Sequence, residues 1–384
     1  MKIVQINTFS NKSTGTIMMN IHNKLKEEKI ESYVVWGRGR KAQDSTEIYM
    51  NDKIGIYWHG LYTRFTDKVG FASKRATRKL IKKLDKIKPD IIHLHNIHGY
   101  YINIEILFNY IKKNNIKVVW TLHDCWAFTG HCSHFELIGC EKWKECCNCC
   151  EQKSKYPKSF VDNSNWNYQR KKELFTGLNM TIVTPSKWLA NLVKQSFLKQ
   201  YEVKVINNGI DTNIFKPRKS DFRKKFNIED KKIILGVASD WTKEKGLYDF
   251  YKLSKKLDDD VKIVLVGLNK RQVKEIPNNI IGIERTENAQ QLAEIYTTAD
   301  IYFNPTYADN FPTTNLEALA CGTPVFTYNT GGSIECLNES NGKITNLTDF
   351  SENYKSYLKQ EFKIDKVKTE SEMELEYITI YSNF

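Results

Sequence analysis

Two kinds of segment alternate along the chain. Short runs of β-branched and other apolar residues, typical of buried strands, are separated by longer segments with helical spacing of apolar positions. In the first part of the chain, strands are expected at residues 3–6, 33–36, 91–94, 118–122, 181–184 and 203–206, and helices at 16–28, 104–113 and 186–196. This alternation predicts a parallel sheet with helices on both faces.

The same pattern starts again after a polar and basic stretch at residues 211–232, which indicates an interdomain linker. Strands are expected at 233–238, 261–267 and 301–303, and helices at 246–257 and 289–298. A chain of 384 residues is longer than one hydrophobic core usually serves. We therefore expect an α/β protein with two doubly wound domains, 1–210 and 211–362, and a polar C-terminal segment at 363–384 with a moderate helical pattern.

The stretch Asn304–Glu335 carries the densest candidate chemistry. An apolar run ends at Pro305, and a helix is expected over 313–320 with Thr313 or Thr314 as its N-cap. A short strand over 324–328 then leads to residues 330–333, which are expected to open a further helix. Ligands of open α/β sheets bind where strands end and helices begin, so this stretch is a candidate binding edge.

The polar groups of this edge suit a nucleotide sugar. Asp309 in the loop and Glu317 in the helix are carboxylates that accept hydrogen bonds from sugar hydroxyls. Backbone N–H groups near Asn310, Phe311 and Gly332 favour an anion such as a diphosphate. The alternative is a solvated helix carboxylate beside an ordinary turn.

The spacing of these two acids resembles the Glu-x7-Glu segment of retaining glycosyltransferases of family four, which have the GT-B fold. That fold consists of two Rossmann-like doubly wound domains facing a central cleft. In the family the last helix crosses back to the first domain, and the resemblance implies the same for a helix at 363–384. The resemblance covers about residues 1–345 and implies that Glu317 binds the nucleotide ribose while Asp309 contacts the donor sugar. Aspartate replaces the family's first glutamate and has a shorter reach.

Other segments extend the resemblance. Gly15 occupies the glycine turn after the first strand, where family members bring backbone close to the donor diphosphate, and 208–211 resembles the domain junction. Lys245 aligns with the family's phosphate-binding lysine, and the alternative is a surface lysine at a helix start. Asp240 stands where the family usually has arginine, and Lys243 is a candidate substitute as a point charge.

Four histidines follow predicted strands. The resemblance places His123 near the donor sugar, where it orients sugar and acceptor without forming a covalent bond. The alternative for His123 is a capping or core histidine. A buried structural role is expected for His93 and an acceptor-side role for His95 or His98, and no metal is expected here.

Seven of the nine cysteines fall between Cys125 and Cys150, in a predicted insertion at 125–150. Such crowding in a cytosolic protein favours a metal over disulfides. The expected set is four thiolates in a closed structural zinc site: Cys132, Cys140, Cys147 and Cys150. Cys146 and Cys149 form an equally allowed pair. This region also resembles a subset of family-four enzymes from capsule and lipopolysaccharide gene clusters, and in that resemblance Cys147 and Cys150 fit the paired positions. Metal-free thiols are the alternative.

The net charge of +13 implies attraction to polyanions. The densest basic run, 74–88, predicts a helix with Leu80, Leu84 and Ile87 on one face and basic residues on the other. That basic face is either an ordinary solvated surface or a contact with an anionic membrane. No apolar run approaches 18 residues and no secretory signal precedes the first strand, so we expect a cytoplasmic protein that can be peripheral at the inner face of the membrane.

The resemblance implies a retaining, hexosyltransferase-type enzyme that needs no metal or other cofactor for catalysis. It would move a sugar from a UDP- or GDP-sugar to a saccharide or lipid-linked saccharide acceptor in bacterial surface polysaccharide synthesis. One alternative is a basic zinc-containing nucleic-acid-binding protein, but no recognised binding module is present, so no nucleic acid partner is expected. Another is a different GT-B enzyme such as a sugar-nucleotide epimerase or a phosphorylase.

Overall fold

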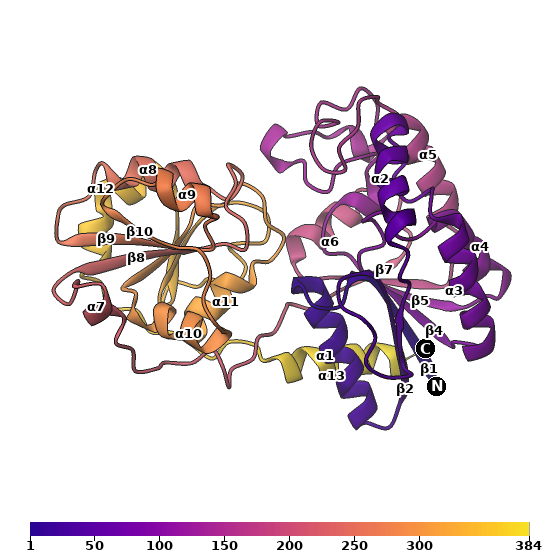
Figure 1. The fold of residues 1–384 in the computed structure, drawn as a ribbon, viewed down its shortest axis with the longest axis horizontal. Helices are drawn as coiled ribbons and strands as arrows, with labels where there is room; N and C mark the ends of the chain where they lie inside the picture. Colours follow the sequence, from indigo (N-terminus) through magenta and orange to yellow (C-terminus); the bar gives the residue numbers. More distant parts are fainter. Residues whose placement is uncertain (384) are drawn as a thin grey trace. The chain divides into compact units, whose positions relative to one another are not determined.

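The chain folds into two α/β units, which are described one at a time (Figure 1). The computed structural model describes residues 1–383. Unit 1 comprises Met1–Asn207 together with the C-terminal segment from Glu374. Unit 2 comprises Asn208–Met373.

Unit 1 is built on a seven-stranded parallel sheet with the order β3-β2-β1-β4-β5-β6-β7. The strands are β1 (Lys2–Phe9), β2 (Glu31–Arg38), β3 (Glu47–Tyr49), β4 (Ile91–Leu94), β5 (Lys117–Thr121), β6 (Met180–Thr184) and β7 (Glu202–Val205). The helices are α1 (Ser13–Glu27), α2 (Lys53–Thr66), α3 (Lys74–Ile87), α4 (Ile104–Lys113), α5 (Ser164–Phe175), α6 (Lys187–Val193) and α13 (Glu370–Ser382). Three short 3₁₀ turns lie between β5 and α5, at Trp126–Phe128, Glu136–Ile138 and Lys142–Lys144.

Unit 2 has a six-stranded parallel sheet with the order β10-β9-β8-β11-β12-β13. Its strands are β8 (Lys232–Val237), β9 (Val261–Val266), β10 (Ile280–Ile283), β11 (Ile301–Asn304), β12 (Val325–Tyr328) and β13 (Gly342–Thr345). Its helices are α7 (Phe222–Lys225), α8 (Leu247–Ser254), α9 (Lys270–Glu275), α10 (Ala289–Thr298), α11 (Thr313–Ala320) and α12 (Leu347–Tyr357). The prediction of two Rossmann-like, doubly wound parallel-sheet domains is confirmed.

The central strands are apolar because each sheet is covered on both faces. Every residue of β4, β6, β11 and β12 is buried, as expected for parallel strands between helical layers. Several helices begin at polar caps: the side chains of Asn103, Ser186 and Asn288 each accept a hydrogen bond from a backbone N–H in the first turn of α4, α6 and α10. Local capping and core burial therefore agree on where these elements begin.

The last helix, α13, packs into unit 1. Tyr377 and Tyr381 are almost fully buried. The Tyr381 hydroxyl lies 2.6 Å from Nδ1 of His93, and the Tyr377 hydroxyl lies 3.1 Å from the Thr121 hydroxyl. The helix thus brings its two tyrosines to side chains of β4 and β5, more than 250 residues earlier in the chain.

Three expectations about local structure are wrong. Residues 211–232 are part of unit 2, because Phe222 and Ile228 are buried in its core. Residues 331–336 form successive turns in place of a helix, with hydrogen bonds from Ser333 N to Thr330 O and from Glu335 N to Gly332 O. The N-cap of α11 is Pro312, and its side chain caps nothing.

Residues 51–73 lacked a prediction and contain α2. Its apolar residues lie mainly on the outside, so the usual assumption that an apolar stripe faces the core gives no guide to this helix. Among residues 1–383, no helix combines the length and apolar character that crossing a membrane requires.

Candidate functional site

The order of strands locates the candidate site in unit 2. The sheet order reverses direction between β8 and β11, which are hydrogen-bonded neighbours. At such a switch point the loops after the two strands diverge to opposite faces and leave room for a ligand. The loop after β8 contains Lys245, and the loop after β11 contains Asp309. Residues 64 positions apart in the chain therefore meet at one sheet edge.

Lys245 and Asp309 form an ion pair at this edge. The distance from Lys245 Nζ to Asp309 Oδ2 is 2.6 Å, and the two side chains are 37% and 19% exposed. The loops are held together by a hydrogen bond from Tyr307 N to Glu244 O at 2.8 Å. Gly246 is required here, because its φ is +76° and an added Cβ would lie 2.3 Å from the Pro305 carbonyl oxygen.

Glu317 projects from α11 and is held by Tyr296 of α10. The Tyr296 hydroxyl donates to Glu317 Oε2 at 3.0 Å. Burial raises the pKa of Glu317 to about 7, although hydrogen bonds from Tyr296 and Thr313 oppose the rise. Burial raises the pKa of Tyr302, and the charges of Glu317 and Asp309 add to the rise. Both acids of the sequence motif are thus near enough to this buried hydroxyl to act on it electrostatically.

The remaining donor-side candidates have different surroundings. The Gly332 N–H donates to the Asp309 carbonyl at 3.2 Å, so in this structure it holds the loop. The side chain of Phe311 is buried against Ile210 and Leu316, and Asn310 is buried beside it in the chain. Lys243 is exposed on the same loop as Lys245. The structure thus pairs Lys245 with Asp309, holds Glu317 through Tyr296, and leaves Lys243 outside the ion pair.

Gly15 lies inside the first turn of α1, in unit 1. A Cβ there would lie 2.5 Å from the Phe9 carbonyl oxygen. Close packing of α1 against the end of β1 therefore already requires glycine at this position. The predicted contact with a donor diphosphate stays a prediction.

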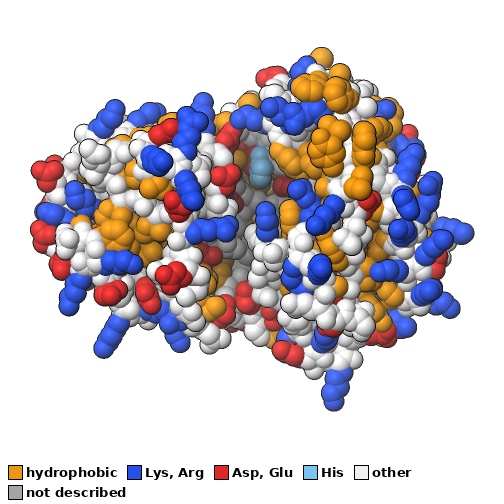
Figure 2. Space-filling view, viewed as in Figure 1, with side chains coloured by type: hydrophobic (Ala, Val, Ile, Leu, Met, Phe, Trp, Pro, Cys, Tyr) orange, Lys and Arg blue, Asp and Glu red, His pale blue; other side chains and the backbone are white. Residues whose placement is uncertain are grey.

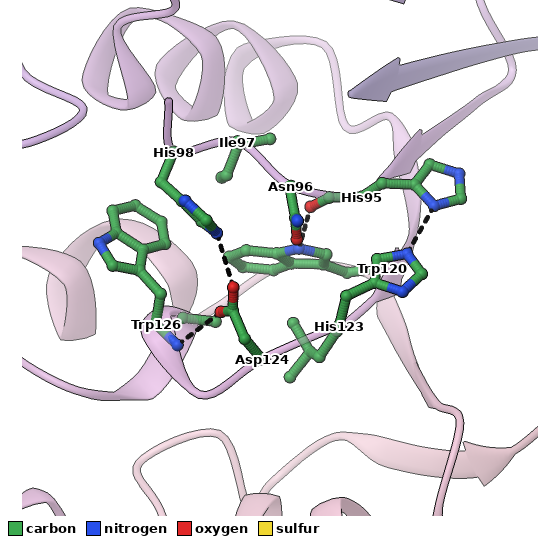
Figure 3. A pocket seen from close by; sticks show the side chains of 10 residues that line it. His95, Asn96, Ile97, His98, Trp120, His123, Asp124 and Trp126 are labelled. Atoms are coloured by element: carbon green, nitrogen blue, oxygen red, sulfur yellow. Dashed lines mark hydrogen bonds and ion pairs between the residues drawn. The ribbon is translucent and has the colours of Figure 1, made fainter. Parts of the chain in front are cut away.

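Unit 1 has its own polar cluster at the ends of β4 and β5 (Figure 3). A small pocket there is lined by ten residues: His95, Asn96, Ile97, His98, Trp120, Leu122, His123, Asp124, Trp126 and Ala127. His98 points at Asp124, with 2.8 Å between His98 Nε2 and Asp124 Oδ2. The other ring nitrogen of His98 lies 3.0 Å from the Tyr156 hydroxyl. Burial alone would raise the pKa of Asp124, but His98 and the Trp126 N–H outweigh it and hold the pKa at about 2.

His95 and His123 face each other in the same cluster. His95 Nδ1 and His123 Nε2 are 3.1 Å apart, and their rings are stacked with 5.4 Å between centroids. Burial lowers the pKa of His123 to about 4 and also lowers the pKa of His95 well below its usual range. Both rings are therefore neutral at pH 7 and can each donate one hydrogen bond and accept one. His93 is fully buried between Thr121 and Tyr381.

Three polar residues of these sites were not expected from the sequence. Asp124 directly follows His123, and a carboxylate so soon after a buried strand is the signal in the sequence that could have identified it. Tyr156 and Tyr296 carry no such signal, because each reaches its partner from a distant segment: Tyr156 lies 58 residues from His98, and Tyr296 lies 21 residues from Glu317.

The Cys-rich segment gathers the four predicted thiols on one side of the unit 1 core. Cys132 is buried in that core, and Cys140, Cys147 and Cys150 pack against it. The sulfurs of Cys132 and Cys150 are 3.6 Å apart. The hydrogen bond with Cys150, then burial and the charges of Cys150, Cys147 and Cys140, raise the pKa of Cys132. These thiols are thus close enough to interact with one another electrostatically.

The other candidate pair points elsewhere. The Cys146 sulfur accepts hydrogen bonds from Asn165 and Gln169, and Cys149 is exposed. Over residues 1–383, however, no three or more His, Cys, Asp or Glu side chains are arranged as ligands of a metal ion. The donor chemistry fits zinc, while the four-sulfur coordination itself stays a prediction.

Two family models match the chain. "Glycosyltransferase Family 4" matches residues 14–214, more than half of the chain, and "Glycosyl transferases group 1" matches residues 218–372. The boundary between the matches falls close to the boundary between units 1 and 2. Each model therefore covers most of one unit.

Individual relatives agree with these matches. WcaC of Escherichia coli strain K12, a glycosyl transferase assigned by name to colanic acid biosynthesis, is 23% identical over 89% of this chain and 87% of its own length. An N,N'-diacetylbacillosaminyl-diphospho-undecaprenol α-1,3-N-acetylgalactosaminyltransferase of Campylobacter jejuni is 27% identical over 49% of this chain and 54% of its own length.

Solved structures show the same fold. Alr3699/HepE of Anabaena, solved in complex with UDP, superposes with a TM-score of 0.64 at 13% identity, over the full length of both chains. Its likeness extends the agreement in fold to both units. From the two family matches and this fold, the chain belongs to the GT-B glycosyltransferases of family four.

Proposed function

We propose that the protein is a retaining glycosyltransferase of bacterial surface polysaccharide synthesis. It moves a hexose-type sugar from a nucleotide-diphosphate sugar to a saccharide acceptor carried on a lipid. The single observation that carries the proposal is the Lys245–Asp309 ion pair at the switch point of unit 2. Relatives named for colanic acid synthesis and for transfer to an undecaprenol-linked saccharide support the choice of pathway and acceptor.

Each group of the unit 2 site has a role in binding the donor. Glu317, held by Tyr296, accepts hydrogen bonds from the ribose hydroxyls, and Asp309 accepts them from the sugar. Lys245 places a positive charge where negative charge develops on the leaving diphosphate, so it stabilises the transition state more than the bound donor. Its partner Asp309 orients the ammonium group before the donor binds.

Unit 1 supplies neutral and acidic groups for hydroxyl recognition. His123 and His95 are neutral at pH 7. His95 is engaged on both ring nitrogens, by His123 and by Gln5, so it positions His123, whose other ring nitrogen suits the orientation of a hydroxyl. His98 and Asp124 form a second pair, which we assign to the acceptor. Catalysis in this proposal is positioning and charge stabilisation, without a covalent enzyme intermediate or a catalytic metal.

A donor screen tests this function. Purified full-length protein is incubated with UDP-, GDP- and dTDP-sugars while release of free nucleotide is followed. Turnover of one donor, together with a rise in the melting temperature in its presence, is the expected result. If no nucleotide sugar is turned over and none shifts the melting temperature, the assignment of a donor site is wrong.

We also propose that the four thiols Cys132, Cys140, Cys147 and Cys150 bind one structural zinc ion per chain. The expected result of metal analysis is one zinc per chain in the wild type and a lower zinc content in Cys132→Ser, because a closed site needs all four thiolates. Cys149→Ser is the matched control, since Cys149 is exposed and outside the set. Wild-type protein without zinc would show that the cluster consists of free thiols.

A further inference from the structure

Helix α2 exposes its apolar face to solvent. The side chains Ile54, Tyr57, Trp58, Tyr62 and Phe65 fall at positions i, i+3, i+4, i+8 and i+11 of the helix and are between 38% and 74% exposed. The fully buried positions are polar instead, His59 and Thr63, while Ile56 is partly buried against the core. An amphipathic surface helix normally faces the other way. We call this surface the α2 patch, together with Phe160, which is 59% exposed.

The orientation of α2 is fixed by its buried polar contacts. His59 Nδ1 lies 2.8 Å from the Ser73 hydroxyl, and His59 Nε2 accepts the Gly70 N–H at 3.0 Å. At the other end of the helix, the Arg64 carbonyl accepts the Phe160 N–H at 2.8 Å and the Ser159 hydroxyl at 3.2 Å. The aromatic side chains are therefore held outward by the fold itself.

The patch is continuous across two segments of the chain. The rings of Phe65 and Phe160 are 5.5 Å apart between centroids, and the Arg64 guanidinium carbon lies 5.4 Å from the Phe160 ring centroid. Figure 2 shows exposed hydrophobic side chains gathered over this part of unit 1, with Lys and Arg side chains beside them. Contiguous exposed apolar surface of this kind marks an interaction site.

Charge narrows the choice of partner. Residues 53–66 contain Lys53 and Arg64 and no acidic residue, and residues 153–161 contain three lysines and no acidic residue. A second copy of the same surface would place cations against cations. An anionic bilayer offers both an apolar interior for the side chains and phosphate groups for the cations. Trp and Tyr also favour the boundary between headgroups and acyl chains.

We infer that the α2 patch is the surface by which unit 1 inserts shallowly into an anionic membrane. The basic helix α3 differs, because its apolar residues Leu80 and Leu84 are buried in the core and only its charged face is outside. One chain segment joins the α2 patch to the unit 1 pocket. Tyr156 lies four residues before Phe160 of the patch, and the Tyr156 hydroxyl contacts His98 of the pocket. A lipid-linked acceptor at the membrane would thus meet His98 and Asp124 close to this surface. Only this encounter of the acceptor with His98 and Asp124 rests on the proposed function; membrane binding by the α2 patch does not.

Vesicle co-sedimentation tests the inference with the full chain and without any sugar donor. Phosphatidylcholine vesicles are compared with vesicles that also contain phosphatidylglycerol. We expect wild-type protein to prefer the anionic vesicles, with weaker binding at high salt, and the double variant Trp58→Ser/Phe65→Ser to bind at least about tenfold more weakly. Tyr248→Ser removes an equally exposed aromatic residue from α8 in unit 2 and should bind as the wild type does.

Two results would overturn the inference. One is equal vesicle binding by the wild type and the double variant, or no binding by either. The other is a wild-type dimer in light scattering that becomes a monomer in the double variant, which would assign the patch to self-association. Donor turnover is measured separately in the nucleotide-release assay, so a wild type that turns over the donor but does not bind the vesicles contradicts the membrane surface and leaves the transferase assignment standing.

Discussion

Lys245→Ala is expected to lower kcat for donor turnover at least about tenfold, equivalent to about 1.4 kcal/mol of lost transition-state stabilisation. The ammonium group of Lys245 lies 2.6 Å from Asp309 at the switch point of unit 2. Negative charge on the leaving diphosphate grows as the glycosidic bond breaks, so a cation there acts mainly on the transition state. The measurement is steady-state release of nucleotide with the donor found in the screen.

Glu317→Ala should give a different kinetic signature. A residue that holds the ribose contacts a part of the donor that does not react, so its loss weakens binding of donor and transition state alike. We therefore expect a tenfold or greater fall in kcat/KM that appears mainly as a rise in KM. Tyr296→Phe, which removes the hydroxyl that holds Glu317 Oε2 at 3.0 Å, should shift KM in the same direction by a smaller factor.

Two lysine variants act as controls. Lys255→Ala changes an exposed lysine at the C-cap of α8 and should leave both constants unchanged. Lys243→Ala tests whether a second cation on the same loop contributes, and it should change kcat less than Lys245→Ala because Lys243 lies outside the ion pair. Unchanged kinetics in both Lys245→Ala and Glu317→Ala would show that the donor site lies elsewhere.

The sequence predicted the architecture of both units because parallel strands buried on two faces leave a strong local signal. Runs such as 91–94 and 181–184 are buried throughout and rich in β-branched residues, and the helices α4 and α6 that follow them begin at polar caps. The meeting of Lys245 with Asp309 was expected only through a family resemblance, since no local pattern states which two loops of a sheet are neighbours. The strand order explains why the two residues meet, because β8 and β11, whose following loops carry them, are adjacent in the sheet.

Other features were missed because they depend on contacts remote in sequence. Helix α2 has a helical stripe of aromatic residues, yet local pattern alone cannot say that His59 turns inward to meet Ser73 and Gly70. The turn at 331–336 begins with the glycine pair that suggested a helix start, but its backbone is engaged by the Asp309 carbonyl. In both cases a specific polar contact, supplied by another segment, outweighs the local pattern.

Tyr381→Ala is expected to destabilise unit 1 by about 3–5 kcal/mol, the usual cost of removing a large buried aromatic side chain. Tyr381 is 1% exposed, and its hydroxyl lies 2.6 Å from His93 Nδ1. Tyr381→Phe keeps the ring and removes only the hydroxyl. It should cost about 1–3 kcal/mol, because a buried ring nitrogen of His93 is then left without a partner.

Urea unfolding followed by tryptophan fluorescence measures this loss in unit 1. Seven of the eight tryptophans lie in unit 1, and Trp241 is the one in unit 2, so the signal reports mainly on the unit that contains α13. Leu375→Ala on the same helix is the matched control. Leu375 is 48% exposed, so its loss should change the free energy of unfolding by less than about 0.5 kcal/mol.

The relative loss of unfolding free energy in the three variants distinguishes an effect of side-chain packing from an effect of helix propensity. If α13 were only loosely attached, Tyr381→Ala and Leu375→Ala would have similar, small effects, since both replace a residue of one helix by the best helix former. A large cost for Tyr381→Ala, an intermediate one for Tyr381→Phe and almost none for Leu375→Ala can arise only if the helix is docked through its tyrosines. Because His93 precedes His95 on the strand that leads to the unit 1 pocket, such docking would also stabilise the histidines that we assign to substrate recognition.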